Sequence, residues 1–426
     1  MREQVIDKSG NDAAQGAASS TSKPKPGGAT HRLGILDDFR GVGVMCIFLG
    51  HCLVSLPVNL QALFDRPWQF AWSALSGKVD PQTLIAFIVF FPFHLAWAAL
   101  PTFFVVSGFC IQLTFCQTSR QPSRTDLVAY YIRRIFRIYP PYLVGLLFFA
   151  FVFPWSRLPF DKLTYWGQFV THLFMCHNVS ELSVCAINSS YWTLAIEVQL
   201  YMLFPLLFFY VRRTSWTRAL VWLAGIELAL RIMASFGFEL QGQFTSVYLR
   251  ANPFYYCFSW VVGAALADAY MSGKPLPFSK VHWMVWAVIG LLTSQYPTHS
   301  FSWPFFALAT GSYLSRHLSR ESVEEKKSLL GRYVRATGLY SYSIYLIHTP
   351  ILLTVVKLCE DHVPGMDRNP YLIFGVGAAT WIFFFPLGAL MYHWVEKPGI
   401  DLGKKVMRWY RDRRSQVALL NQGATP

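Results

Sequence analysis

The chain contains repeated apolar stretches long enough to cross a lipid bilayer, and no other feature constrains its fold as strongly. A transmembrane helix needs about 20 predominantly apolar residues. The 426 residues are 54% hydrophobic, 17% aromatic and only 14% charged, which is too apolar for an ordinary soluble protein of this size. We therefore predict an all-α, polytopic membrane protein.

About ten stretches have the length and composition of transmembrane helices. Those between 281 and 315 give the weakest signal. The predicted spans are 35–56, 84–113, 139–155, 191–211, 217–236, 252–270, 281–295, 302–315, 337–358 and 371–393.

The distribution of basic residues predicts the orientation of these spans. With the N-terminus in the cytoplasm, 28 Lys and Arg fall in cytoplasmic segments and seven in the opposite loops. The positive-inside rule therefore favours a cytoplasmic N-terminus and a cytoplasmic C-terminus. The same bias explains the net charge of +14, so nucleic acid is not needed as a partner. Anionic lipid or a phosphorylated cytoplasmic ligand suits this surface better.

Three regions follow from this pattern. Residues 1–32, rich in Ser, Gly, Ala and Lys, are expected to be a disordered cytoplasmic tail. Residues 33–397 form the membrane domain, whose first span replaces a secretory signal. Residues 398–426 form a basic cytoplasmic tail, within which Leu402 to Leu420 resembles a short surface helix. In a bacterium the protein would lie in the cell membrane.

The eight cysteines lack the spacing of metal ligands, and we expect no metal site. Most lie within predicted spans, where Cys serves as a small apolar residue. Cys176 and Cys185 share the long outward loop 157–190, and whether they form a disulfide stays open. The same loop carries glycosylation sequons at Asn178 and Asn188, which matter only in a glycosylating host.

Arg40 and His51 are cationic or readily become so at membrane depth in the first span. Eleven residues separate them, a rotation of roughly 1,100°, so both side chains face within about 20° of one direction. His51 lies roughly 16 Å further along the axis. Such groups are costly in lipid, and an aligned pair indicates a polar cavity entered from one side. The alternative is a snorkelling Arg and a His paired with a neighbouring helix.

Glu197 lies about six residues inside the span that opens at Tyr191, at a depth similar to that of His51. If their helices are neighbours, the carboxylate and the imidazole can share a proton or jointly orient a hydroxyl. The alternative is a Glu that only packs helices together. Glu227 and Arg231, four residues apart on another span, are interpreted as a structural pair.

A basic cluster, Arg133, Arg134 and Arg137, stands directly before the third span. Arg133 and Arg137 share a helical face, and the Pro140-Pro141 step is expected to end or kink the helix. Guanidinium groups suit phosphate. The cluster can be ordinary positive-inside anchors, yet Arg40 opens on the same side, so one phosphorylated ligand could reach both.

Two further motifs carry polar residues at membrane depth. FFVVSGF places Ser107 in the inner half of the second span, where a small residue permits close approach of a helix or ligand. YSYSIYLIHTP places His348 near the middle of a span, close to Tyr345. A lone histidine there is more often hydrogen-bonded packing than a catalyst.

In their order, these motifs resemble the acyltransferase-3 family of integral-membrane acyltransferases. The matching runs are LGILDDFRGVGVMCIFLGHC, FFVVSGF, RRIFRIYPPY, YWTLAIEVQLYMLFPLL, YSYSIYLIHTP and HWVEKP, from about Leu33 to Lys397. The resemblance implies transfer of an acyl group, often acetyl, from a cytoplasmic coenzyme A thioester to a hydroxyl of a sugar or other acceptor. It also implies that Arg40 and His51 are essential and that Arg133, Arg134 and Arg137 serve the donor.

The chain departs from the family pattern at two positions. Asp38 stands where the family commonly has Gly, which adds charge near the presumed donor entrance. Val198 replaces the second Glu of the fourth-span motif, which leaves Glu197 as the carboxylate of interest. We expect no esterase-like domain, since only about thirty residues follow Glu396.

We therefore predict a membrane O-acyltransferase. The expected roles are His51 as general base with Glu197 in support, Arg40, Arg133, Arg134 and Arg137 at the acyl-CoA donor, and Ser107, Tyr345 and His348 as substrate or structural support. No Ser or Cys is convincingly paired with a base, so no covalent intermediate is expected. The acceptor, whether polysaccharide, glycolipid or secondary metabolite, stays open. A sugar or lipid transporter is the alternative, and a sensor without turnover is a third possibility.

Overall fold

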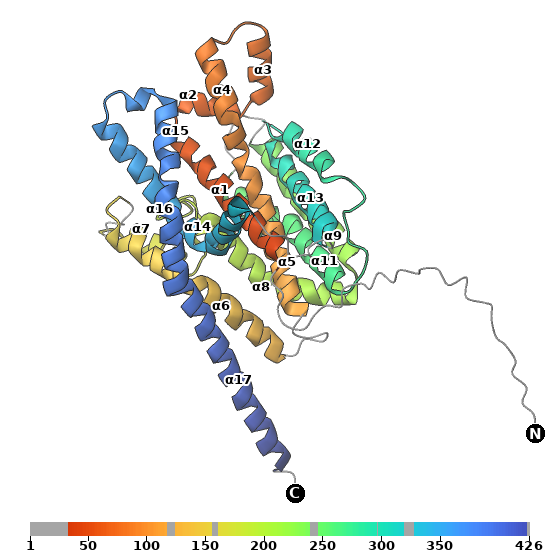
Figure 1. The fold of residues 1–426 in the computed structure, drawn as a ribbon. Coiled ribbons are helices and arrows are strands. Elements are labelled where there is room, and N and C mark those ends of the chain that lie inside the picture. The colour runs from red at the N-terminus through yellow and green to blue at the C-terminus, as the bar shows by residue number, and fades with distance from the viewer. Residues whose placement is uncertain are drawn as a thin grey trace, which may run out of the picture. The chain divides into compact units, whose positions relative to one another are not determined.

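The computed structural model describes residues 33–116, 124–155, 161–238, 246–295, 297–318 and 328–423. Throughout these ranges the regular structure is helical, and they contain no strand (Figure 1). Helices suit a bilayer because each one pairs its own backbone N–H and C=O groups. The all-α prediction is thus confirmed, while the predicted disordered tail 1–32 lies outside the described residues.

The α-helices run along the chain as follows: α1 Gly34–Cys52, α2 Val58–Phe64, α3 Pro67–Leu75, α4 Pro81–His94, α5 Ala99–Cys116, α6 Arg124–Leu147, α7 Leu163–Leu173, α8 Trp192–Arg213, α9 Trp216–Gly237, α10 Val247–Arg250, α11 Cys257–Met271, α12 Trp283–Thr293, α13 His299–His317, α14 Leu329–His362, α15 Pro370–Ala379, α16 Trp381–Met391 and α17 Lys397–Gly423. A 3₁₀ turn, Leu95–Ala98, joins α4 to α5, and π turns at Phe148–Val152 and Tyr392–Glu396 follow α6 and α16.

Within the described residues, seven helical segments are long and apolar enough to cross a bilayer: Gly34–Ser55, Pro81–Phe115, Asp126–Val152, Trp192–Arg213, Trp216–Gly237, Leu329–His362 and Pro370–Arg414. The other three predicted spans, 252–270, 281–295 and 302–315, correspond to α11, α12 and α13. The apolar helices α11 and α12 are too short to count among the seven. Residues of α13 that are buried include several Ser and a Thr, which lower its apolar character.

Two helix crossings depend on glycine. At the crossing of α1 and α14, a Cβ on Gly41 would lie 2.0 Å from the Val334 carbonyl oxygen. At the crossing of α5 and α11, a Cβ on Gly108 would lie 1.9 Å from the Trp260 carbonyl oxygen. In both places only a glycine lets the two backbones approach so closely. These contacts fix α14 on one side of α1 and α11 against α5.

We expected the Pro140-Pro141 step to end or kink the helix, and it does not end α6, which continues to Leu147. Pro140 lacks an N–H and so leaves the carbonyl of Phe136 without its usual helical donor. Gly399 of α17 packs directly against that carbonyl, where a Cβ would lie 2.7 Å from the oxygen. The contact between α6 and α17 therefore covers the gap that the proline makes.

The C-terminal region is one long helix rather than a separate short one. The predicted surface helix, Leu402 to Leu420, lies within α17, which continues from α16 through the π turn Tyr392–Glu396 (Figure 1). Gly399 and Gly403 of α17 both pack against Phe136 of α6. The helix is thus anchored to the segment that carries the arginine cluster.

Candidate active site

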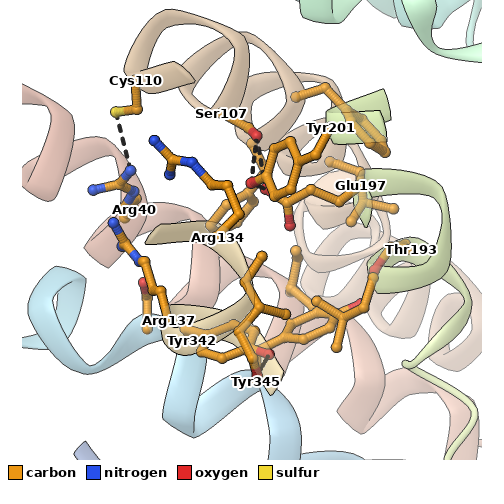
Figure 2. Close-up of a pocket in the computed structure, with 17 residues that line it drawn as sticks. Arg40, Ser107, Cys110, Arg134, Arg137, Thr193, Glu197, Tyr201, Tyr342 and Tyr345 are labelled. Atoms are coloured by element: carbon orange, nitrogen blue, oxygen red, sulfur yellow. Dashed lines mark hydrogen bonds between the residues drawn. The ribbon is translucent and has the colours of Figure 1, made fainter. Parts of the chain in front are cut away.

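A cavity of about 120 Å³ lies among α1, α5, α6, α8 and α14 (Figure 2). Its polar lining combines cations, one carboxylate, hydroxyls and a thiol. These residues are Arg40, Ser107, Cys110, Arg134, Arg137, Thr193, Glu197, Tyr201, Ser341, Tyr342 and Tyr345. The cavity therefore draws together residues from five of the six motifs of the sequence.

Three arginines provide the positive charge of the cavity. Arg40 makes an ion pair with Asp37 at 3.3 Å and donates a hydrogen bond to Sγ of Cys110 at 3.1 Å. Arg134 is buried, with its guanidinium carbon 5.7 Å from the ring centroid of Tyr201. No carboxylate of the described residues lies within ion-pair distance of Arg134 or Arg137. Two cations thus line the cavity without a matching anion from the described chain.

The side of α6 that faces the cavity is not the one that carries both Arg133 and Arg137, which the sequence suggested. Arg134, Arg137 and Ile138 line the cavity, whereas Arg133 does not. Positions i, i+3 and i+4 share one side of a helix, which explains this set. Arg133 instead interacts electrostatically with Arg411 of α17 and with Asp126. The structure therefore brings together three of the four predicted donor residues.

Glu197 belongs to a hydrogen-bonded cluster that lies beside Arg134 in the same cavity (Figure 2). Ser107 Oγ donates to Glu197 Oε1 at 2.7 Å, and the Tyr201 hydroxyl donates to the same oxygen. The hydroxyls of Ser107 and Tyr201 lie 3.0 Å apart, and Trp260 Nε1 donates to Ser107 Oγ at 3.4 Å. The FFVVSGF motif thus supplies, through Ser107, a hydroxyl that holds the Glu197 carboxylate.

His51 does not line this cavity and does not contact Glu197. Its Nδ1 lies 2.7 Å from Nε2 of His348 and 3.1 Å from Oγ1 of Thr349. Thr349 also lies 3.0 Å from His348 Nε2 and bonds to the hydroxyl of Ser190. His348 is fully buried, whereas His51 keeps part of its surface accessible. Equal depth did not make Glu197 the partner of His51, because depth does not decide which helices are neighbours.

Tyr345 connects the cavity to the histidine pair. Its ring lines the cavity, and its hydroxyl lies 2.5 Å from Thr193 Oγ1, also a lining residue. Its backbone carbonyl accepts a hydrogen bond from His348 Nδ1 at 2.9 Å. One residue therefore touches both the cavity wall and the pair.

Sequence reasoning missed several residues of this region, although a periodic signal was available for some. Cys110 follows Ser107 by three residues, and Thr193 and Tyr201 lie four residues from Glu197 on either side, so each shares a helical face with a predicted residue. Ser190 carried no such signal, since it precedes α8. No three His, Cys, Asp or Glu side chains gather into a potential metal site within the described ranges.

Charged residues away from the cavity form structural pairs. Glu227 and Arg231 make a buried ion pair at 2.8 Å on α9, as interpreted from their spacing. Arg231 Nη2 also donates to the carbonyl of Tyr255 at 2.7 Å. Asp38, a departure from the family pattern, pairs with Arg335 of α14 at 3.1 Å. Its charge therefore serves the contact between α1 and α14.

The loop before α8, which the sequence predicts to face outward, contains features that the sequence left open. Cys176 and Cys185 are free, exposed thiols. Both sequon asparagines are buried, and Asn178 Nδ2 donates to the carbonyl of Ala251 at 2.8 Å. Asn188 Nδ2 donates to the carbonyl of Leu346 at 2.9 Å. These amides therefore hold the loop on the helices and are not available for glycan attachment in the folded protein.

Comparisons with known proteins agree with this arrangement of motifs. Residues 34–396 match the acyltransferase domain family. A peptidoglycan O-acetyltransferase of Listeria monocytogenes is 24% identical over 360 residues, which cover 75% of this chain and 55% of that protein. A putative peptidoglycan O-acetyltransferase of Bacillus subtilis is 26% identical over 327 residues, which cover 70% of this chain and 49% of that protein.

The chain spans about half the length of these curated relatives. No solved structure matches it. The family match covers the apolar helices, the arginine cluster and the histidine motifs, and with the bilayer-length helices it makes the protein a multi-pass integral membrane protein. The chain belongs to the acyltransferase-3 family of integral-membrane acyltransferases, which transfer acyl groups other than aminoacyl groups.

Proposed function

We propose that the protein transfers an acyl group, most simply acetyl, from acyl-CoA to a hydroxyl of a carbohydrate acceptor. The observation that carries this proposal is the cavity in which Arg134 and Arg137 face Glu197 and its hydroxyl cluster. The arginines suit a phosphorylated donor, and the hydroxyl cluster suits a hydroxylic acceptor. The names of the relatives, peptidoglycan O-acetyltransferases, support acetyl as the group and a glycan as the acceptor class. They give no support to a transporter.

The donor would bind through the arginines. Guanidinium forks pair well with phosphate oxygens, and Arg134 and Arg137 lack a carboxylate partner within the described chain. Arg40 of α1, held by Asp37 and Cys110, would guide the thioester arm. Arg133 stands outside the cavity and would act only through the surrounding charge.

The chemical step would be a direct transfer with His51 as general base. His51 removes the proton of the acceptor hydroxyl while the oxygen attacks the thioester carbonyl carbon. The C–S bond then breaks, coenzyme A leaves as the thiolate, and the imidazolium returns the proton to that sulfur. The Glu197, Ser107 and Tyr201 cluster would bind another hydroxyl of the same acceptor inside the cavity. The reacting hydroxyl would reach His51 beyond Tyr345, the residue that touches both the cavity and the histidine pair. Holding donor and acceptor together would supply much of the remaining rate enhancement.

The proposed topology has ten spans with both termini in the cytoplasm. The seven long helical segments support most of it, and α11, α12 and α13 would provide the other three crossings. Because α11 is buried among neighbours almost throughout, it would cross as an inner helix. The surplus of Lys and Arg in the predicted cytoplasmic segments supports the orientation.

A transfer assay tests the function. The purified protein in lipid nanodiscs is given acetyl-CoA labelled in the acetyl group together with peptidoglycan fragments, and both CoA release and labelled glycan are measured. We expect labelled ester on the glycan and loss of transfer in His51→Ala, in proportion to a general-base effect of about a hundred- to ten-thousandfold. A folded wild-type protein that binds no acetyl-CoA would refute the donor assignment. Transfer to none of a panel of glycans would refute the acceptor class.

Labelling of native thiols tests the orientation. Cys176 and Cys185 are exposed in the loop predicted to lie outside the cytoplasm, so no cysteine needs to be introduced. Ser183 in the same loop is buried and bonded to the His177 carbonyl, which makes it a poor labelling site. A membrane-impermeant maleimide should label both cysteines in intact cells. Labelling only after the cytoplasmic face is opened would reverse the topology and the direction of transfer.

A further inference from the structure

We propose that His348 is a positioning residue that fixes the tautomer of His51, so that Nε2 of His51 is the nitrogen that accepts the substrate proton. This inference rests on the proposed function, in which His51 is the base. It adds an assignment of protons to both rings and a role for the backbone carbonyl of Tyr345. The argument depends on the geometry of the pair and on which of its partners can only accept.

The two imidazole rings are joined edge to edge by a hydrogen bond in the plane of the rings. Their facing nitrogens lie 2.7 Å apart, and the ring centroids lie 4.9 Å apart with an interplanar angle of 17°. In rings stacked face to face, the planes would lie too far apart for two nitrogens to approach to 2.7 Å while the centroids stay 4.9 Å apart. The geometry therefore requires one N–H donor and one lone pair between His51 Nδ1 and His348 Nε2.

The carbonyl of Tyr345 decides which ring donates. It lies 2.9 Å from His348 Nδ1, and because a carbonyl oxygen can only accept, that nitrogen must carry a proton. A neutral His348 protonated at Nδ1 has its lone pair on Nε2. His51 must then donate from Nδ1 to this lone pair, which leaves the lone pair of His51 on its own Nε2. A basic nitrogen is thus prepared before any substrate binds.

The turn of α14 that carries the Tyr345 carbonyl is attached to the loop before α8 at a gap in the helical hydrogen bonds. Pro350 has no N–H, so the Leu346 carbonyl, four residues earlier, loses its helical donor. Asn188 Nδ2 donates to that carbonyl at 2.9 Å, and the Tyr191 hydroxyl donates to it at 3.2 Å. The loop before α8 is thereby fixed against the turn of α14 that carries His348.

Hydrogen bonds from hydroxyl groups further hold His51 and His348 in place. Ser190, from the same loop, bonds through its hydroxyl to Thr349, and its carbonyl accepts from the Tyr345 hydroxyl at 2.7 Å. Thr349 Oγ1 in turn lies 3.0 Å from His348 Nε2. His348 is fully buried, so it cannot itself meet a substrate hydroxyl, whereas His51 is partly accessible. The arrangement suits a buried orienting group behind an accessible base.

Two variants of His348 with side chains of similar length test whether it positions His51. Gln at position 348 offers an amide oxygen that can accept from His51 Nδ1, whereas Met fills similar space without a comparable acceptor. We expect His348→Met to lower kcat about ten- to a hundredfold, the range found when a metal-bound histidine loses its orienting partner, with the KM for acetyl-CoA unchanged. We expect His348→Gln to recover most of the loss. Equal damage by Gln and Met in folded protein would overturn the proposal.

A double-mutant cycle separates positioning from packing. Because His348 acts only through His51, adding His348→Met to His51→Ala should cause no further loss of transfer. Losses that multiply would show that His348 acts independently, and the proposal would fail. If His51→Ala itself retains normal transfer, the base assignment of the proposed function fails. If only His51→Ala is impaired, the present inference fails alone.

A spectroscopic measurement on protein that keeps His348 reports the tautomer of His51 directly, so this test does not depend on whether the His348 variants fold. Protein labelled with ¹⁵N-histidine is studied by solid-state NMR in lipid, and the His51 resonances are assigned by their disappearance in His51→Ala. We expect the His51 ring to be neutral, with the proton on Nδ1 and Nε2 unprotonated. A His51 ring that carries its proton on Nε2 would overturn the proposal whatever the kinetics show.

Discussion

Nη2 of Arg40 donates a hydrogen bond to Sγ of Cys110 at 3.1 Å and so joins α1 to α5 at the wall of the cavity, although 70 positions separate the two residues in the sequence. The same thiol lines the cavity, as Ser107 does one turn earlier (Figure 2). A thiol in this place gives a chemical handle on the proposed donor site. No other free cysteine of the described residues lines the cavity.

We predict that a small thiol reagent such as methyl methanethiosulfonate inactivates the protein by modifying Cys110. The added group would occupy space beside Arg40, where the thioester arm is proposed to pass. Cys110→Ser, which keeps an acceptor for Arg40, should stay active and become resistant to the reagent, and saturating coenzyme A should slow inactivation of the wild type. Cys46→Ala, which removes a thiol of α1 outside the cavity, is the matched control and should stay sensitive. Equal sensitivity of Cys110→Ser and wild type would contradict the assignment.

Substitution of the arginines should separate those inside the cavity from the one outside. Arg134→Gln and Arg137→Gln should each weaken acyl-CoA binding by about ten- to a hundredfold, since a charged hydrogen bond is worth about 1.5–3 kcal/mol. Arg133→Gln removes the same charge from the same helix but lies outside the cavity, and it should have a much smaller effect. Isothermal titration with coenzyme A measures all three. Equal losses would mean that only the total charge matters.

The glycines at the two close helix crossings should not tolerate alanine. Gly108→Ala and Gly338→Ala would bring a Cβ within 1.9 Å and 1.8 Å of the Trp260 and Asp37 carbonyl oxygens. The helices would have to separate, and we expect a fall of several degrees in the thermal midpoint measured in detergent. Gly225→Ala on α9 meets nothing within 4 Å and should be neutral or slightly stabilising. Unchanged midpoints in all three variants would contradict the close contacts.

A second pair of buried histidines, His172 and His177, lies outside the candidate spans and should make stability depend on pH. His172 and His177 pack face to face at 4.0 Å, and burial lowers the pKa of His172 to about 4 and that of His177 to about 3. The unfolded chain, with histidine pKa values near 6.5, binds protons in this window that the folded protein does not. Stability should therefore fall as pH is lowered from about 6.5 toward 4, by up to about 1.4 kcal/mol per pH unit for each ring.

Thermal unfolding of His177→Phe between pH 4.5 and 7 checks this expectation. Phe keeps an aromatic ring in the stack but cannot be protonated, so the slope of the thermal midpoint against pH should decrease. His362→Gln, an exposed histidine at the end of α14, is the control and should leave the slope unchanged. If the slope of the thermal midpoint against pH is unaltered in His177→Phe, groups other than His177 cause the loss of stability at low pH.

The sequence predicted most of the helices because the signal for them is local. Apolar length and composition identify a segment that a bilayer can accept, and backbone pairing within the bilayer then favours a helix. The one-helix spacing of Arg40 and His51 was readable for the same reason, since both lie in α1. The signal was weakest for α12 and α13, because α12 is short, although apolar, and α13 buries several Ser and a Thr that lower its apolar character.

The sequence could not decide which side chains meet, because helical periodicity gives a direction about one axis and does not name the neighbour in that direction. Glu197 and His51 share a depth, yet Glu197 meets Ser107 of α5 and His51 meets His348 of α14. That pair is separated by 297 positions. Close approach at Gly41 and at Gly108 sets these neighbours. The sequence alone thus determined the membrane class, the family resemblance and the reactive residue types, and tertiary packing determined their partners.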